Sequence, residues 1–368
     1  MSSSFFTSSS SSDGAGSALA AFGWDEALDR DFTAHRADGL VPARIVRVDR
    51  GRCDVVTESG PVRAGSAAVS SPDPVLSPCT GDWAGLRTGS DPQLVALLPR
   101  RSVIVRSAAG RSSHGQALAA NIDTVVVAVS LAAPPNPGRI ERLLALAWDS
   151  GAVPVLALTK LDLADPSDAD AAQSEAAALA PGVDTVVTSA ATGAGLDILS
   201  ALTHGTTVLL GPSGAGKSTL ANALLGADVL ATGAVRAQDG KGRHTTVHRE
   251  LLPLPGGGVL IDTPGLRGIG LQDAADGLEQ VFAEIEELAQ ECGFRDCGHD
   301  SEPGCAVRKA IRSGRLSERR LDSYRKLLRE SDWAASRSDA RMRAGRTDQQ
   351  KSITRHLRAT YRFRERLQ

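Results

Sequence analysis

The stretch Val155–Pro166, VLALTKLDLADP, decides how this chain of 368 residues is interpreted. Its first half is a continuous apolar run, which is typical of a strand buried on both faces of a sheet. Four residues follow that strand directly: Thr159, Lys160, Leu161 and Asp162. A glycine-rich loop, GPSGAGKST, comes only later in the chain. The order of these two pieces is the feature to be explained.

The later loop has the pattern Gly-x4-Gly-Lys-Ser, preceded by the apolar run TTVLL and followed by the helical pattern KSTLANALLG. In that context its backbone N–H groups cradle phosphate oxygens, and the glycines keep side chains out of the space. Lys217 would neutralise the β- and γ-phosphates, and Ser218 would hold Mg²⁺. The loop alone does not choose between ATP and GTP. The expected nucleotide contacts are Gly211, Pro212, Ser213, Gly214, Ala215, Gly216, Lys217, Ser218 and Thr219.

The earlier TKLD segment supplies a choice of base. The Asp162 carboxylate can accept hydrogen bonds from guanine N1–H and its 2-amino group, a donor pair that adenine lacks, and the Lys160 stem can lie on the base. A second segment, Thr188-Ser189-Ala190, also follows a strand pattern, and we expect the backbone of Ser189 and Ala190 to contact the guanine oxygen. TKLD by itself fits a surface turn, but beside the loop it predicts a guanine nucleotide.

Two further segments fit the γ-phosphate and its magnesium ion. Asp262 ends the strand pattern GVLI and opens DTPG, so it can reach Mg²⁺ through water while Gly265 gives its N–H to the γ-phosphate. In GKGRHTTVHRE, either Thr245 or Thr246 can close on Mg²⁺, and the sequence leaves this choice open.

The order is therefore base reader, TSA, phosphate loop, threonine pair and DTPG. A doubly wound sheet can be cut and rejoined where its termini lie close in space, which is common in domains. Strand and helix patterns alternate from Asn121 onward, which predicts a parallel sheet covered by helices on both faces. A circularly permuted sheet explains the order.

The cysteines predict a metal site beyond that sheet. Three of the chain's five cysteines crowd together in the pattern Cys292-x4-Cys297-x-His299-x5-Cys305. Three thiolates and an imidazole make a closed tetrahedral site of the structural zinc type; loosely grouped thiols are the alternative. We interpret Cys53 and Cys79 as core or surface thiols.

Composition sets the remaining bounds. With 42% hydrophobic and 23% charged residues and a net charge of −2, the chain fits a globular protein, and any RNA contact must come from local patches. No apolar run reaches the roughly 18 residues of a membrane span. The serine-rich start is expected to be a disordered tail rather than a signal peptide, and the arginine-rich end a basic tail.

Ahead of the sheet, short alternating strands broken by Gly, Pro and Asp predict a small β-barrel. Arginines recur through it, as either a solvated strand face or a phosphate-contacting face: Arg44, Arg47, Arg50, Arg52, Arg100, Arg101, Arg106 and Arg111.

With these parts in place, the chain resembles the RsgA (YjeQ) family of ribosome-dependent GTPases over roughly residues 36–330. The segments that carry the resemblance are TKLD, TSA, GPSGAGKSTL, GRHTT, DTPG and the Cys-Cys-His-Cys spacing. It implies a multidomain α/β protein with an N-terminal OB-fold barrel, a circularly permuted P-loop GTPase domain and a C-terminal helical zinc-binding domain. The expected boundaries are a tail and lead-in at 1–36, barrel at 37–112, GTPase at 113–270, zinc domain at 271–332 and basic tail at 333–368.

The resemblance also implies GTP hydrolysis coupled to late maturation of the 30S subunit, contact with 16S rRNA, a cytoplasmic location and a mostly monomeric state. Leu266 stands where other GTPases carry a water-orienting glutamine, so slow intrinsic turnover raised by the ribosome is implied. His244 is the nearest candidate to position water, and a structural contact is its other role. We expect GTP–Mg²⁺ to order GRHTT and DTPG, and the change to reach the zinc domain that follows.

Two other classes of protein remain open at this point. One is an RNA-binding scaffold with a vestigial nucleotide site, which intact Lys217, Ser218 and Asp262 disfavour. The other is a P-loop kinase or ATPase with an accidental TKLD.

Overall fold

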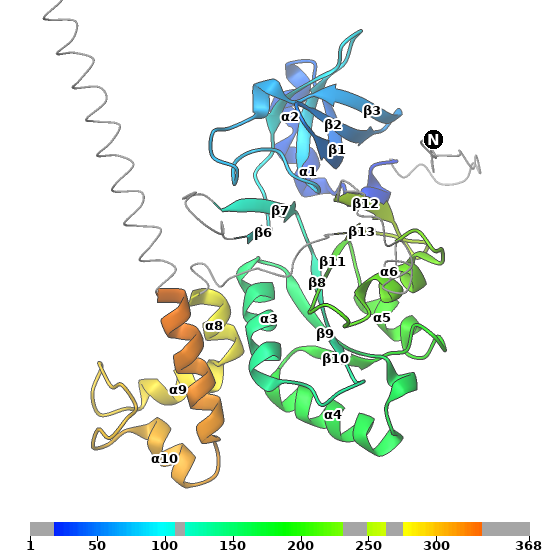
Figure 1. The fold of residues 1–368 in the computed structure, drawn as a ribbon. Helices are drawn as coiled ribbons and strands as arrows, with labels where there is room; N and C mark the ends of the chain where they lie inside the picture. The colour runs from blue at the N-terminus through cyan, green and yellow to red at the C-terminus, as the bar shows by residue number, and fades with distance from the viewer. Residues whose placement is uncertain (1–17, 107–114, 231–248, 263–274, 333–368) are drawn as a thin grey trace, which may run out of the picture.

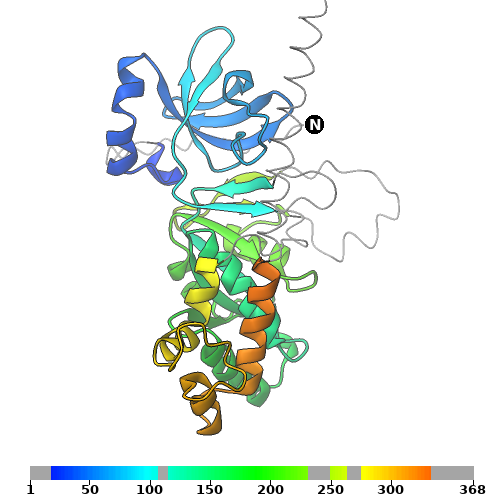
Figure 2. The same cartoon turned by 90° about the vertical axis from the view of Figure 1, so that its left-hand side faces the viewer.

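The computed structural model describes residues 18–106, 115–230, 249–262 and 275–332. A barrel, a sheet flanked by helices and a helical module follow one another along the chain (Figure 1). In the turned view of Figure 2, the barrel lies above the sheet and the helical module lies in front of the sheet. Within the described residues, no helix combines the length and the apolar character needed to cross a membrane.

The barrel is built from five strands and confirms the β-barrel predicted for this region. Hydrogen bonds close it in the order β1-β2-β3-β5-β4, with β4 returning to β1, as in an OB-fold. The strands are β1 (Val41–Asp49), β2 (Arg52–Thr57), β3 (Gly60–Gly65), β4 (Trp83–Arg87) and β5 (Gln93–Leu97). A short 3-10 turn, η2 (Ala67–Val69), follows β3.

The lead-in before the barrel is folded onto it. It forms η1 (Ala20–Phe22), α1 (Glu26–Asp31) and α2 (Thr33–Ala37). Asp25 caps α1 by accepting a hydrogen bond from the Leu28 N–H at 2.8 Å. Trp24 lies edge-on to Trp83 of the barrel with ring centroids 4.9 Å apart. The lead-in therefore shares the hydrophobic core of the barrel.

A six-stranded sheet forms the centre of the molecule. Its order is β10-β9-β8-β11-β13-β12, and only the edge strand β12 runs antiparallel. The strands are β8 (Thr124–Ser130), β9 (Val153–Thr159), β10 (Asp184–Val187), β11 (Thr206–Leu210), β12 (Glu250–Pro253) and β13 (Val259–Asp262). The helices between them are α3 (Pro137–Asp149), η3 (Leu161–Leu163), α4 (Pro166–Leu179), α5 (Leu196–Leu202) and α6 (Lys217–Leu225).

Successive side chains of these strands enter two different cores. Val125 and Val127 of β8 pack in the core that includes α3 and α4, whereas Val126 packs with Leu199 of α5 and Leu220 of α6. This alternation explains the continuous apolar runs, because each parallel strand is covered on both faces. The predicted sheet with helices on both faces is confirmed.

The arginines of the barrel region do not form one face, because several are structural. Arg44 is 1% exposed and stacks on Trp83, while it donates to Thr206 Oγ1 at 2.9 Å and to the Asn121 carbonyl oxygen at 3.2 Å. Burial lowers its pKa to about 10. Arg100 pairs with the buried Asp82 at 2.7 Å. Arg44 and Arg100 therefore belong neither to a solvated strand face nor to a phosphate-contacting face. Arg111 lies outside the described residues.

A hairpin of β6 (Val103–Arg106) and β7 (Gln116–Ala120) joins the barrel to the sheet. Beyond the sheet, the helical module contains α8 (Ala275–Val281), α9 (Ala283–Gln290), α10 (Ala306–Arg312) and a helix over residues 318–332. The helical segment before the cysteines is divided at Phe282, whose φ of −115° and ψ of 32° leave the helical region. A Cβ on Gly277 of α8 would lie 2.1 Å from the Ala145 carbonyl oxygen, so α8 approaches α3 backbone to backbone.

The junction of barrel and sheet predicts a position-specific cost for a methyl group. Gly81 has a φ of +94°, and a Cβ there would lie 2.2 Å from the Ala120 carbonyl oxygen. Gly39 has a φ of +74°, and a Cβ there would meet no atom of the described residues within 4 Å. Alanine at either position pays the left-handed backbone cost of ~1–2 kcal/mol. Gly81→Ala should lose about 1–3 kcal/mol more than Gly39→Ala through overpacking. Denaturant unfolding of both variants measures this, and equal losses would contradict it.

Candidate functional site

The parallel strands bring the predicted nucleotide residues to one edge of the sheet. β8 and β9 end together, with Ser130 opposite Thr159. β11 pairs with β8 on one side and with β13 on the other, where Val208 lies opposite Ile261. TKLD follows β9, the glycine loop follows β11, and Asp262 ends β13. Carboxyl ends of parallel strands are where open α/β sheets bind ligands. The three segments follow a permuted order along the chain, but they still meet at the carboxyl edge of the sheet.

The glycine loop has the backbone that phosphate binding requires. Gly211 has a φ of +149°, and a Cβ there would lie 2.5 Å from the Ala128 carbonyl oxygen. Gly214 and Gly216 have φ values of 83° and 80°, and α6 begins at the next residue, Lys217. These three glycines therefore cannot be replaced without strain. The Lys217 ammonium donates to the carbonyl oxygens of Gly211 and Pro212 at 2.8 and 2.7 Å.

A buried threonine ties the TKLD segment to this loop. Thr159 is 3% exposed, and its hydroxyl donates to the carbonyl oxygen of Ala215 at 2.7 Å. Lys160 takes a left-handed conformation with a φ of 64°, and its stem passes the loop so closely that a Cβ on Gly216 would meet Lys160 Cε at 3.7 Å. The two segments are thus neighbours in space.

The Asp162 carboxylate is exposed and oriented. Ser189 is fully buried, and its hydroxyl donates to Asp162 Oδ1 at 2.5 Å. The Leu161 N–H donates to the Thr188 carbonyl oxygen at 3.1 Å, which joins TKLD to TSA through the backbone. Ala190 follows at the same turn, half-buried. The carboxylate is therefore fixed with its remaining lone pairs toward solvent.

The residues proposed around the γ-phosphate are only partly within the described structure. Asp262 is half-buried at the end of β13, opposite Glu250 of β12. Ser218 is half-buried in the first turn of α6, and Thr219 beside it is exposed. The other predicted residues lie outside the described residues: His244, Thr245, Thr246, Gly265 and Leu266.

The four predicted metal ligands meet in the helical module. Their ligand atoms all lie within 4.8 Å of one another: Cys292, Cys297, His299 and Cys305. The Cys292 and Cys305 sulfurs are 3.9 Å apart, and they lie 3.6 and 3.5 Å from His299 Nδ1. An ideal tetrahedral ion with metal–sulfur bonds of about 2.3 Å and metal–nitrogen bonds of about 2.0 Å places these pairs about 3.8 and 3.5 Å apart. The donor set therefore fits a four-coordinate ion.

Local contacts hold the metal loop in shape and tune its ligands. The Glu302 carboxylate accepts backbone N–H bonds from Gly298 and Asp300, each at 2.8 Å. Burial lowers the pKa of His299, which favours the neutral imidazole that metals bind. Burial raises the pKa of Cys292, but backbone N–H groups of Ala306 and Val307 help to bring it below the usual thiol value.

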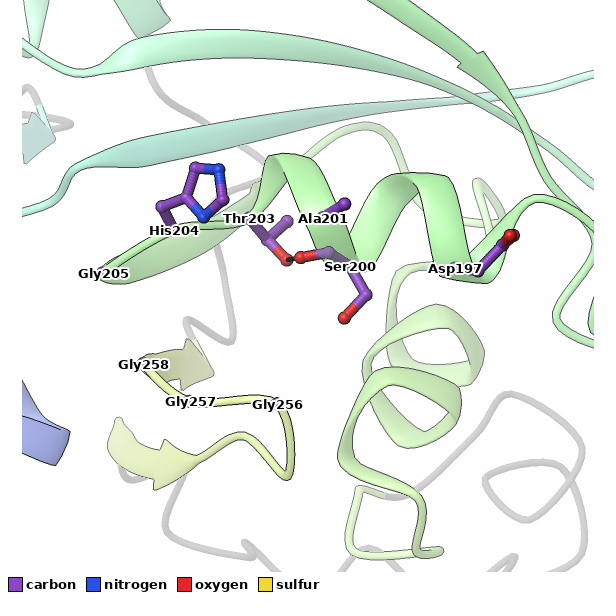
Figure 3. Close-up of a pocket in the computed structure, with 9 residues that line it drawn as sticks. All are labelled: Asp197, Ser200, Ala201, Thr203, His204, Gly205, Gly256, Gly257 and Gly258. Carbon is purple, nitrogen blue, oxygen red and sulfur yellow. Dashed lines mark hydrogen bonds between the residues drawn. The ribbon is translucent and has the colours of Figure 1, made fainter. Parts of the chain in front are cut away.

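A separate cavity lies at the opposite edge of the sheet. It has a volume of about 500 Å³ and a mainly polar lining (Figure 3). His204 and Gly205 come directly before β11, and Gly256–Gly258 come directly before β13, so the cavity opens at the amino ends of these strands. None of the predicted nucleotide and metal residues that the structure describes lines it.

Two supporting side chains were not anticipated from the sequence. Ser189 was expected to act through its backbone, whereas its hydroxyl orients Asp162. Glu302 organises the metal loop, although only the ligands were singled out. The sequence signal for the role of Glu302 was its acidic side chain between two metal ligands, His299 and Cys305.

Three comparisons with known proteins agree with this geometry. The family model described as RsgA GTPase matches residues 97–272. A relative from Streptomyces coelicolor, "Small ribosomal subunit biogenesis GTPase RsgA", is 57% identical over 89% of this chain and 90% of its own length. A relative of the same name from Methanosarcina acetivorans is 42% identical over 86% of each chain.

Solved structures show the same fold. YjeQ from Thermotoga maritima has a TM-score of 0.58 at 25% identity and covers 79% of this chain and 98% of its own. YloQ, described as a circularly permuted GTPase, has a TM-score of 0.59 at 22% identity and covers 80% of this chain and 95% of its own.

The metal geometry predicts the effect of removing one sulfur. Cys297→Ser leaves three good ligands, so bound metal per chain should fall from near one equivalent to a small fraction of it. Ser301→Ala, an exposed change in the same loop, should keep its metal. Elemental analysis of the purified variants after dialysis measures both, and a full equivalent in Cys297→Ser would contradict the site.

Proposed function

The chain belongs to the RsgA family of GTPases, and from this premise we propose that it hydrolyses GTP to GDP and phosphate as a small ribosomal subunit biogenesis factor. The small subunit would stimulate turnover during late 30S maturation, and 16S rRNA would be the surface contacted. A cytoplasmic location and a monomeric state belong to the same proposal.

One observation carries the nucleotide part of this proposal. Thr159 Oγ1 bonds to Ala215 at 2.7 Å and so joins a segment suited to a base to a loop suited to phosphates. A guanine held by Asp162 and covered by the Lys160 stem would place its phosphates in the glycine loop. Both ends of one nucleotide are therefore served at one edge of the sheet.

We assign the chemistry at the phosphates as follows. Lys217 would leave the loop carbonyls to neutralise the β- and γ-phosphates, because an ammonium is drawn to a concentration of negative charge. Ser218 and one of Thr245 and Thr246 would bind Mg²⁺, with Asp262 acting through a water molecule. The Gly265 N–H would bind the γ-phosphate, and His244 is the candidate that positions water.

Zinc is the ion that we propose for the four-ligand cluster. Three thiolates with one imidazole in a tetrahedral array are characteristic of structural zinc, and a closed set leaves no position for a reacting water. The ion would therefore stabilise the module rather than take part in hydrolysis.

The division of labour follows the boundaries expected from the sequence. We propose that the barrel at 37–112 and the zinc domain at 271–332 contact the small subunit, while the GTPase domain at 113–270 sets when they bind and release. The tails at 1–36 and 333–368 carry no assigned role, apart from the lead-in helices on the barrel.

The other two classes give different nucleotide behaviour. A P-loop kinase or ATPase would bind ATP, whereas the Asp162 carboxylate, held by the Ser189 hydroxyl, supports a guanine base, whose N1–H and amino group are donors. A scaffold with a vestigial site would bind without turnover. Measurements of GTP turnover and of base preference distinguish both classes from the proposed GTPase.

The first experiment measures GTP turnover with and without purified small subunits. Turnover by the full chain should rise by at least about tenfold on addition of subunits, since partner-assisted GTPases gain up to roughly 10³–10⁵. Lys217→Ala is the control for contaminating activity, and it should show no GTP turnover either with or without subunits. Equal rates with and without subunits would sink the ribosome-activated part.

The second experiment exchanges the base preference. Asp162→Asn should weaken GTP binding by about 1.5–3 kcal/mol, the range of hydrogen bonds to a charged group. It should improve binding of xanthosine triphosphate, whose base presents an oxygen in place of the amino group. Asp165→Asn, an exposed neighbour whose side chain makes no capping bond, is the matched control. An unchanged preference in Asp162→Asn would remove TKLD as the base reader.

A further inference from the structure

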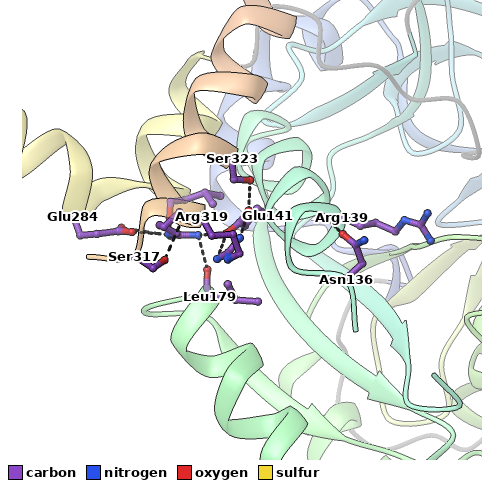
Figure 4. Close-up of polar contacts among 10 residues, drawn as sticks. Asn136, Arg139, Glu141, Leu179, Glu284, Ser317, Arg319 and Ser323 are labelled. Carbon is purple, nitrogen blue, oxygen red and sulfur yellow. Dashed lines mark hydrogen bonds and ion pairs between the residues drawn. The ribbon is translucent and has the colours of Figure 1, made fainter. Parts of the chain in front are cut away.

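A buried carboxylate joins the GTPase sheet to the helical module. Glu141 lies in the middle of α3, and its side chain has no exposed surface. It accepts hydrogen bonds from Arg320 at 2.8 Å, from Arg319 at 3.0 Å and from the Ser323 hydroxyl. All three donors belong to the helix over residues 318–332 (Figure 4). One acid on the GTPase side thus binds three groups of the module.

Arg320 occupies the centre of this contact with every donor used. Its Nε–H donates to Glu284, one terminal nitrogen donates to Glu141 and the Leu179 carbonyl oxygen, and the other donates to the Val281 carbonyl oxygen and Glu284. A guanidinium has five N–H donors in a rigid fork, so none remains unpaired. The cation also stacks on Phe282 at 4.3 Å. The acceptors come from α3, α4, α8 and α9.

Other contacts extend the seam along α3. Arg142 forms a two-pronged ion pair with Glu330 at 2.9 and 2.6 Å. Gly277 brings the backbone of α8 against Ala145, where a Cβ would clash. The module is therefore held at three successive positions along α3, Glu141, Arg142 and Ala145, rather than by one flexible link.

The same helices fix the metal loop. Cys292 comes just after α9, the helix that carries Glu284. Arg325, five positions beyond Arg320 on the same helix, pairs with Asp300 at 2.7 Å and donates to the Gly298 carbonyl oxygen. The metal loop is thus connected to α3 by two routes, and both pass through the helix over residues 318–332. One runs through Glu284 and Arg320, and the other through Arg325.

We propose that Arg320 is a positioning residue that locks the metal-binding module to the GTPase sheet in one orientation in both nucleotide states, and that stimulation by the small subunit requires this fixed orientation. The proposal rests on the function proposed above. It departs from the expectation that motion in the GTPase domain is passed on to the zinc domain. A swinging module would have to separate Arg320 from the Glu141 carboxylate and the Leu179 carbonyl oxygen, and so break a buried ion pair; Glu284 lies within the module and would move with Arg320.

The functional test compares three variants in the full chain. Arg320→Gln removes the cation, Arg320→Lys keeps the charge but loses the fork, and Arg319→Gln removes the half-exposed neighbour that shares Glu141. Intrinsic turnover, GTP affinity and bound metal should stay near wild type in all three, because none of these residues lies at the nucleotide edge or in the metal cluster.

Subunit-stimulated kcat should separate the variants. We expect Arg320→Gln to lose stimulation within the roughly 5- to 150-fold range of coupling between sites. Arg320→Lys should be intermediate, and Arg319→Gln close to wild type. Full stimulation of Arg320→Gln would overturn the proposal. Absence of stimulation in the wild-type chain would instead overturn the proposed function.

A distance measurement on the otherwise wild-type protein tests the lock without weakening it. Spin-labelled residues would replace Gln173 of α4 and Lys309 of α10, which are both exposed. The distance distribution should be the same with GDP and with a non-hydrolysable GTP analogue. A nucleotide-dependent shift beyond the width of the distribution would show a swinging module and overturn the lock, even if Arg320→Gln fails to fold.

Discussion

The hydrogen bond from Thr159 to the Ala215 carbonyl oxygen is the constraint on which the nucleotide edge depends. It joins the ends of β9 and β11, two strands separated in the sheet by β8. Because parallel strands point their carboxyl ends the same way, a base-reading turn and a phosphate loop can meet in either order along the chain. The permutation therefore changes which segments are covalently joined but leaves the edge intact, and it lets the chain run from β13 toward a module of its own.

The local motifs could be predicted from the sequence, and for a physical reason. A phosphate loop needs glycines at left-handed positions and a lysine at the start of a helix. Gly214, Gly216 and Lys217 meet these needs within a few residues, so the motif can be recognised from the local sequence. The metal ligands are similarly confined to one loop. The apolar runs of the sheet follow from burial on both faces, so the central fold was also accessible.

The contacts between bodies could not be predicted, because their partners lie far apart in the sequence. Arg44 was read as one of a set of strand arginines, yet it is buried against Thr206. Glu141 interrupts the apolar stripe of α3, which signals a buried charge but not the identity of its partner. Arg320 lies in a run of charged residues on an amphipathic helix, and the pattern does not show which of them is buried. Burial with a distant partner reverses the usual preference of such residues for water.

The two seams of the GTPase domain treat their buried cations differently. Arg44, at the barrel, bonds to a hydroxyl and a carbonyl oxygen, and its Nε has no hydrogen-bond partner among the described residues. Its lowered pKa records the cost of that burial, which Asp123 and Asp82 offset only in part. Arg320, at the module, binds two carboxylates and has no donor left over. Removing one partner of a buried ion pair typically costs about 3–5 kcal/mol, because the other charge is left buried and unpaired. The module seam therefore depends on both Glu141 and Arg320, whereas Arg44 at the barrel seam is held by neutral acceptors.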